Sequence, residues 1–257
     1  MITAYHRPQT LEEALELLQR AEARPLGGGT LLSQATPEAI EVVDLQALEL
    51  NDIQKSGNTL SVGATSTLQE LHDHELCPPA LQTAIKLEAT LNLRNAATVA
   101  GTIMAADGRS PFVTLLLALD TKLTVVSHTA EEKSLSLGEL LSTRNDFRGQ
   151  LITKMDIPAQ AQSAFESVSR TPSDKPILCI ALAQWNSGRT RLTVGGFGKT
   201  PSLAMDGTES DGAETAARNA CHESGDEWAS AAYRMDIAAK LANRALNQLN
   251  PDSSATS

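Results

Sequence analysis

The chain has 257 residues, 41% of them hydrophobic, and a formal net charge of −10 from 31 acidic and 21 basic residues. This length is enough to bury a sizeable core, in one large domain or in two to three small ones. The basic residues are scattered, which excludes the clustered positive surface of a nucleic-acid-binding protein, and no apolar run reaches the roughly 20 residues of a membrane-spanning helix.

The N-terminal part predicts alternating helices and strands. Thr10 and Glu13 have the spacing of a capping box, in which the hydroxyl and the carboxylate close the first turn, so we expect a helix from Leu11. Thr67 and Glu70 repeat this signal. Apolar periodicity adds strands at 24–26, 40–45 and 59–65 and helices at 67–75 and 80–89.

The middle of the chain continues this alternation. Ser110 and Pro111 read as an N-cap followed by proline at the first helical position, which predicts a helix that runs to Leu119. We expect strands at 122–127 and 150–157, with a short helix at 137–141 between them.

The last third predicts an antiparallel sheet and two helices. The expected strands are 164–170, 177–185 and 189–197, with a hairpin turn at 186–188. Helices should follow at 209–222 and 228–249, and the polar tail 251–257 should be disordered. The apolar face of the second helix is predicted to contain Tyr233, Ile237, Leu241, Ala245 and Leu249.

Two stretches of small residues are candidates for a ligand site. Residues 25–31 read Pro-Leu-Gly-Gly-Gly-Thr-Leu, and residues 92–107 are mostly small and lead into Ser110. Small side chains leave peptide N–H groups open to anionic oxygens, so two such loops can hold one pyrophosphate between them. Loops that need small residues only for packing have the same composition, and this alternative stays open.

The other motifs in the sequence do not support a different kind of site. Residues 195–200 resemble the end of a phosphate-binding P-loop, but Thr193 stands where the motif needs its first glycine and Pro201 opposes a following helix. His72 and His74 lie two apart on a predicted helix, so they point to different faces and do not chelate a metal together. Rossmann and hydrolase motifs do not occur.

The number and spacing of the cysteines indicate the cellular compartment and whether the chain can bind an iron–sulfur cluster. Cys77, Cys179 and Cys221 are an odd, widely spaced set, so they form no disulfide framework and offer no paired ligands to an iron–sulfur cluster. Residues 1–8 lack the basic-then-apolar pattern of a secretion signal. We expect a cytoplasmic location, and an iron–sulfur cluster that serves this protein must belong to another chain.

Several blocks in a fixed order resemble one family. The matching blocks are residues 8–14, 25–30, 94–102, 115–120, 150–158, 195–201 and 231–234. With them the chain resembles the FAD-binding (medium) subunit of the molybdenum-containing hydroxylases, the family of carbon monoxide dehydrogenase and xanthine dehydrogenase. Residues 25–30 resemble the first pyrophosphate loop of that family, and residues 94–102 resemble the second.

This resemblance implies an α+β fold of the vanillyl-alcohol-oxidase type, in which two α+β subdomains hold FAD and a C-terminal antiparallel sheet with helices follows. The corresponding divisions are 1–54, 55–160 and 161–250, with 251–257 as the tail. It assigns to FAD the residues Leu26, Gly27, Gly28, Gly29, Thr30, Leu31, Thr98, Ala100, Gly101, Thr102 and Asp107.

The resemblance also implies a role and partners. The FAD would take electrons from the iron–sulfur clusters of a small subunit, after a large molybdopterin subunit has oxidised the substrate, in a hetero-oligomer that is a dimer of such trimers. The chain departs from the family pattern at Leu31, Ala100, Thr102 and Pro111. These departures support an alternative, in which the protein is a structural subunit or stand-alone homologue that has lost FAD.

Overall fold

The computed structural model describes residues 1–34, 37–129, 131–172 and 174–250, and the tail predicted to be disordered lies outside them. The chain forms two compact units, each of them from three segments. Unit 1 contains residues 1–76, 91–105 and 121–157, and unit 2 contains 77–90, 106–120 and the chain from 158 onward. Both units mix helices with sheets, which confirms the α+β class. The predicted three-part division remains a prediction.

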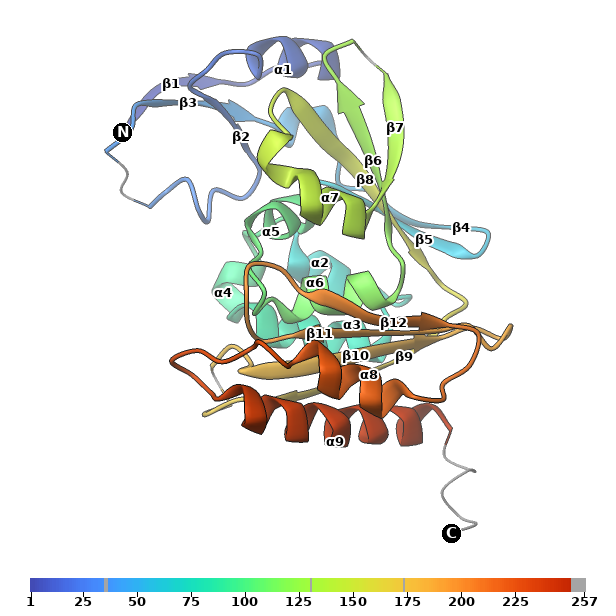
Figure 1. Ribbon diagram of the computed structural model, residues 1–257. Coiled ribbons are helices and arrows are strands. Elements are labelled where there is room, and N and C mark those ends of the chain that lie inside the picture. Colours follow the sequence, from blue (N-terminus) through green and yellow to red (C-terminus); the bar gives the residue numbers. More distant parts are fainter. Residues whose placement is uncertain (35–36, 130, 173, 251–257) are drawn as a thin grey trace. The chain divides into compact units, whose positions relative to one another are not determined.

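A small parallel sheet opens unit 1 (Figure 1). Its strands are β1 (Ile2–His6), β2 (Ala23–Leu26) and β3 (Ile40–Asp44), in the order β1-β3-β2. Helix α1 (Leu11–Leu17) starts as expected, because the Thr10 hydroxyl accepts the Glu13 N–H.

The second sheet of unit 1 has the strand order β4-β5-β8-β6-β7. These strands are β4 (Ile53–Ser56), β5 (Thr59–Gly63), β6 (Lys122–Ser127), β7 (Glu132–Ser136) and β8 (Gln150–Pro158). Leu15 and Leu18 from the α1 region pack in one apolar cluster with Val43, Val126 and Leu151. The two sheets therefore share a core, which is why they form one unit.

Short helices complete unit 1. They are α2 (Leu68–Asp73), α4 (Leu91–Arg94), α5 (Val99–Ala105) and α7 (Leu137–Thr143), and two 3-10 turns, η1 (Gln46–Leu48) and η2 (Arg144–Asp146), lie between other elements. The stretch of small residues that we expected to be a loop is thus largely helical, which corrects that expectation. The physical reason is a local cap: the Thr98 Oγ1 accepts the Gly101 N–H at 3.2 Å, and the Thr98 carbonyl accepts the Thr102 N–H at 2.8 Å.

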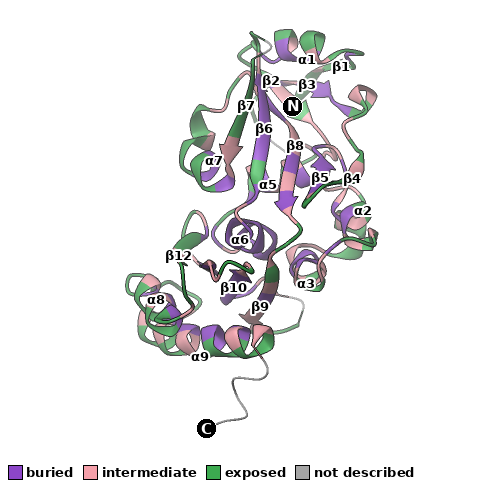
Figure 2. Ribbon diagram, turned by 90° about the vertical axis from the view of Figure 1, so that its right-hand side faces the viewer, coloured by how far each residue is buried: buried purple, intermediate pink, exposed green. Residues whose placement is uncertain are grey.

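Unit 2 is built on an antiparallel sheet in the order β12-β11-β10-β9. The strands are β9 (Gln162–Val168), β10 (Leu178–Gln184), β11 (Thr190–Gly195) and β12 (Ser202–Gly207). Helices α8 (Ala213–Ala220) and α9 (Ala231–Leu249) cover one face, and α3 (Pro79–Glu88) and α6 (Pro111–Ala118) pack on the other. All of α6 is buried (Figure 2), and its N-cap is Ser110, as predicted.

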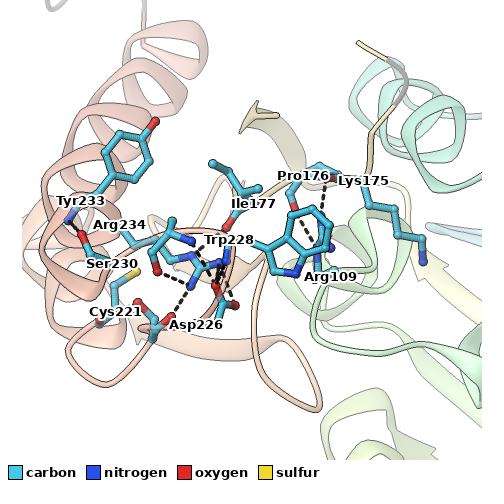
Figure 3. Close-up of polar contacts among 12 residues, drawn as sticks. Arg109, Lys175, Pro176, Ile177, Cys221, Asp226, Trp228, Ser230, Tyr233 and Arg234 are labelled. Atoms are coloured by element: carbon cyan, nitrogen blue, oxygen red, sulfur yellow. Dashed lines mark hydrogen bonds and ion pairs between the residues drawn. The ribbon is translucent and has the colours of Figure 1, made fainter. Parts of the chain in front are cut away.

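The inward face of α9 differs from the expected one. Tyr233 is 41% exposed, whereas Arg234 is fully buried, as are Ala238 and Ala242 farther along the helix. The Arg234 side chain takes the inward position because its guanidinium is satisfied there by the Asp226 carboxylate and by backbone carbonyls (Figure 3). The prediction that Tyr233 belongs to the buried face was therefore wrong.

No helix in the described ranges combines the length and the apolar character that crossing a bilayer requires.

Candidate cofactor site

The glycine loop begins where strand β2 ends. The Leu26 carbonyl accepts the Leu45 N–H at 3.0 Å, which continues the parallel pairing of β2 with β3 by one step. Gly27, Gly28 and Gly29 then leave the sheet at the carboxyl ends of its strands, the edge at which parallel sheets commonly bind ligands. Gly29 has a φ of 70°, a left-handed conformation that favours glycine.

The two stretches of small residues lie directly against each other. A Cβ atom added to Gly28 would lie 1.5 Å from the Ala96 carbonyl oxygen, and one added to Gly27 would lie 2.6 Å from the Thr98 Oγ1. A larger residue at Gly28 requires the backbone to move, and one at Gly27 requires the Thr98 side chain to move. The structure thus brings together the segments in which we predicted the two halves of the cofactor site.

The two segments differ in their free hydrogen-bond donors. Among the described residues, the peptide N–H groups of Gly27, Gly28, Gly29 and Thr30 make no hydrogen bond to another protein group. In the second segment the Thr98 N–H is likewise unpaired within the described residues, but the three N–H groups that follow it are paired. The Val99 N–H donates to the Ser66 carbonyl (2.9 Å), the Ala100 N–H to the Ala64 carbonyl (3.2 Å) and the Gly101 N–H to the Thr98 Oγ1 (3.2 Å). Most of the peptide donors open to a ligand therefore belong to the first loop, and the second segment adds the Thr98 N–H.

A pocket of about 500 Å³ opens beside the glycine loop, within unit 1. Of the predicted cofactor residues, the pocket wall contains Gly27, Gly28, Gly29, Thr30, Leu31, Thr98, Ala100 and Gly101. The other three are engaged elsewhere. The Leu26 carbonyl completes the sheet, the Thr102 Oγ1 donates to the Thr98 carbonyl (2.8 Å), and Asp107 lies in unit 2, where its Oδ1 accepts the Arg109 N–H (2.9 Å).

One wall of the pocket was not identified from the sequence. It runs from Arg144 through Phe147 and Arg148 to Ile152, over η2 and the start of β8. With Arg24 this gives the lining three arginine residues and no acidic residue, although the whole chain is acidic. The signal in the sequence that could have indicated this wall was a pair of arginines, Arg144 and Arg148, in the loop between a predicted helix and a predicted strand.

These residues fit FAD. The pocket lies within the range of about 300–1,000 Å³ that is usual for small-molecule sites, and its apolar part comes from Leu18, Leu45, Met104 and Leu151. Glycines whose Cβ atoms would clash, and whose N–H groups are unpaired, form a cradle for an anion. An apolar pocket with an anion cradle at one edge suits a dinucleotide, which carries rings at both ends and a pyrophosphate between them.

The competing motifs do not form sites. Strand β12 begins at Ser202, directly after the glycine-rich stretch 195–200, so the helix that a P-loop needs is absent from this position. The His72 Nδ1 bonds the Asp73 carboxylate at 2.7 Å, and the described residues contain no group of three His, Cys, Asp or Glu side chains placed to hold a metal ion.

The three cysteines are buried and unbridged. Burial raises the pKa of the Cys77 and Cys179 thiols to about 12 and that of Cys221 to about 11. Thiols with such values are protonated at neutral pH, so they are poor metal ligands and poor nucleophiles.

Comparison with known proteins gives a family. A family model described as "FAD binding domain in molybdopterin dehydrogenase" matches residues 1–160. The uncharacterized protein YgfM of Escherichia coli is 29% identical over 251 residues, with 94% of each chain covered. The glyceraldehyde dehydrogenase medium chain of Sulfolobus acidocaldarius is 26% identical over 220 residues, with 79% of this chain and 78% of the relative covered.

Solved structures share the fold. A chain of Cu,Mo-CO dehydrogenase matches with a TM-score of 0.78 at 22% identity, covering 96% of this chain and 97% of that chain. A chain of quinoline 2-oxidoreductase from Pseudomonas putida matches with a TM-score of 0.76 at 22% identity, covering 95% of each. Since the family model spans more than half of the sequence, the chain belongs to the FAD-binding domains of molybdopterin dehydrogenases and is an FAD-binding oxidoreductase subunit of the molybdenum hydroxylase family.

Proposed function

We propose that this protein is the electron-transfer subunit of such an enzyme, with FAD in the pocket of unit 1 and its pyrophosphate on Gly27, Gly28, Gly29 and Thr30. The observation that carries this proposal is the row of unpaired N–H groups in that loop. Unpaired peptide donors are costly unless water or a ligand satisfies them, and a pyrophosphate accepts several at once.

The residues of the pocket have distinct roles in this proposal. Bound FAD supplies the redox chemistry, because it accepts and releases electrons. The glycine loop fixes the position of the anion, and the segment around Thr98, Ala100 and Gly101 packs against the loop and offers the Thr98 N–H as a further donor. Leu31, which is 52% exposed, forms part of the pocket edge. In this proposal Leu26 and Thr102 shape the backbone of the first and the second segment, respectively. A contact between Asp107 and FAD stays a prediction.

The electron donor in this proposal is another chain. The three buried, protonated thiols cannot supply the four thiolates of an iron–sulfur cluster. One relative is by name a medium chain, and another, 29% identical over 212 residues, is by name a subunit of the 6-hydroxypseudooxynicotine dehydrogenase complex of Paenarthrobacter nicotinovorans. We therefore propose a small iron–sulfur subunit and a large molybdopterin subunit as partners, in a dimer of trimers that works in the cytoplasm.

Two measurements test the two parts of this proposal. The chain purified alone should bind added FAD and acquire the flavin absorbance bands. A correctly folded chain that stays colourless in excess FAD would favour the alternative of a structural subunit without FAD. The chain purified from its native source should co-migrate with iron and molybdenum. A lone flavin-loaded monomer without either metal would contradict the partners and leave the FAD site intact.

A further inference from the structure

We propose that Arg148 is a second anion-binding element, whose guanidinium pairs with the FAD pyrophosphate held by the glycine loop. This inference rests on the proposed function and assigns a ligand contact to a segment that lies more than a hundred residues after that loop in the sequence. Arg148 lines the same pocket as Gly27, Gly28 and Gly29.

The pairing of the second segment creates the need for another partner. Because the N–H groups of Val99, Ala100 and Gly101 already bond to protein acceptors, the start of the second segment adds only the Thr98 N–H to the free peptide donors of the glycine loop among the described residues. Peptide dipoles also carry no formal charge, whereas a pyrophosphate carries two negative charges. A guanidinium supplies both charge and paired N–H donors in a geometry that matches phosphate oxygens.

The arginines of the pocket wall differ in what they contact. The Arg24 Nη1 donates to the carbonyls of Ala21 and Ala23, each at 2.9 Å, so its guanidinium is held by the backbone of its own turn. Arg148 is exposed, and the described part of the chain offers its guanidinium no hydrogen bond and no ion pair. An unpaired cation on a wall without carboxylates is the group that an anionic ligand would engage.

The backbone that carries Arg148 is fixed. The Gly149 carbonyl accepts the Gln19 Nε2 at 3.3 Å, and the Gln150 N–H donates to the Phe147 carbonyl at 3.4 Å. Gly149 has a φ of 72°, and a Cβ atom there would lie 2.6 Å from the Gln19 Nε2. The turn is thus anchored on both sides of Arg148, and only the side chain has to reorient when the ligand binds.

The test compares FAD binding by the wild type, Arg148→Ala, Arg148→Lys and Arg7→Ala in fluorescence titrations at low and high salt. Arg7 is exposed and lies outside the pocket, so its variant removes the same charge from unit 1. Loss of a charge-assisted contact at a solvent-accessible site should raise the Kd of Arg148→Ala about tenfold at low salt. The difference should shrink at high salt. Arg148→Lys should lie between, and Arg7→Ala should match the wild type.

Competition by ADP locates the contact, because ADP carries the two phosphates without the flavin. Arg148→Ala should weaken the binding of ADP by the same factor as that of FAD. Wild-type FAD affinity in Arg148→Ala, an equal loss in Arg7→Ala, a loss that salt does not reduce, or unchanged ADP binding would each overturn the inference. If the folded wild type itself binds no FAD, the proposed function fails as well, so the two failures are distinguishable.

Discussion

Arg234 and Asp226 form a two-pronged ion pair, with the Arg234 Nη2 at 2.9 and 3.0 Å from the two carboxylate oxygens. The Arg234 side chain is fully buried, and its Nε donates to the Ile177 carbonyl at 2.9 Å (Figure 3). Burial acts to raise the pKa of Asp226, but hydrogen bonds from Arg234 and from the N–H groups of Trp228 and Ala229 outweigh it and hold that pKa below its usual value. Together these contacts connect the start of α9 with the preceding turn and with the residue before β10.

Removal of the guanidinium should therefore destabilise unit 2. In Arg234→Ala the Asp226 charge and several carbonyls lose their partner, so we expect a loss of about 3–5 kcal/mol in the free energy of unfolding. Urea titration followed by circular dichroism measures it. Arg244→Ala on the same helix is the matched control, since the Arg244 side chain is 69% exposed and its Nη1 lies 3.8 Å from Glu166. Comparable losses in both variants would contradict a special role for Arg234.

A second network of charged side chains should make the stability of the fold depend on pH. The Asp206 carboxylate lies 2.8 Å from the Arg189 Nη2 and 2.7 Å from the Arg191 Nη1, and the hydrogen bond from Arg189 is the main cause that lowers the pKa of Asp206. A carboxyl whose pKa is lower in the folded state adds stability above its unfolded pKa, and this contribution is lost as pH falls through the folded value.

Asp206→Asn should thus cost about 1–2 kcal/mol at neutral pH, which is typical for the loss of a hydrogen bond to a charged group. The gap between wild type and variant should begin to close as pH falls below about 4, the ordinary pKa of an unfolded Asp, and should vanish once pH has passed through the lower pKa of the folded carboxyl. Thermal melts of both proteins from neutral to acidic pH measure this, and a gap that persists at the acid end would refute it.

The glycine loop should tolerate no side chain at Gly28. The added Cβ would strike the Ala96 carbonyl at 1.5 Å, so Gly28→Val should displace the loop from the 96–98 segment and abolish FAD binding at every concentration tested. This clash is with the protein, so the variant tests how the loop packs and does not by itself prove contact with the ligand. Gly57→Ala is a control that adds a Cβ without a clash, since no atom lies within 4 Å of the added Cβ, and its φ of 59° makes the backbone there less favourable to a side chain than at Gly28. It should bind FAD normally.

The cysteines should resist modification in the folded protein. With pKa values of about 12, 12 and 11, the thiols of Cys77, Cys179 and Cys221 contain almost no thiolate at pH 8, and all three are buried. A thiol reagent followed by mass spectrometry should label none of them in buffer and all three in guanidinium chloride. Rapid labelling of one cysteine in buffer would reveal local opening around it.

Elements with strong local signals were predictable from the sequence. Helices α1, α2 and α6 begin at the expected residues because each N-cap hydroxyl satisfies an N–H two or three positions into its own helix. The strands that we missed were β1, β4, β7 and β12. They are short and lie at sheet edges, so pairing with another strand decides their conformation, and largely exposed side chains such as those of β7 give no clear alternation.

The candidate site could also be predicted only in part. The glycine loop was visible because its residue types are rare outside special backbone geometry, and family resemblance connected it with the segment at Thr98. The wall from Arg144 to Ile152 was invisible, since arginine and phenylalanine in a loop look like ordinary surface until the fold places them beside the glycines. Whether a peptide N–H is free also depends on the whole fold, because the partners of Ala100 and Val99 lie more than 30 residues earlier.

The distribution of pocket walls along the chain has a consequence for biosynthesis. The residues that line the pocket come from the stretches 18–32, 45, 64–65, 98–105 and 144–152. Between them the chain passes twice through unit 2, at residues 77–90 and 106–120. A ribosome that has released only the first hundred residues has released no complete cofactor site and no complete compact unit. FAD should therefore join the protein only after strand β8 has emerged, and no contiguous fragment that ends before it should bind the flavin.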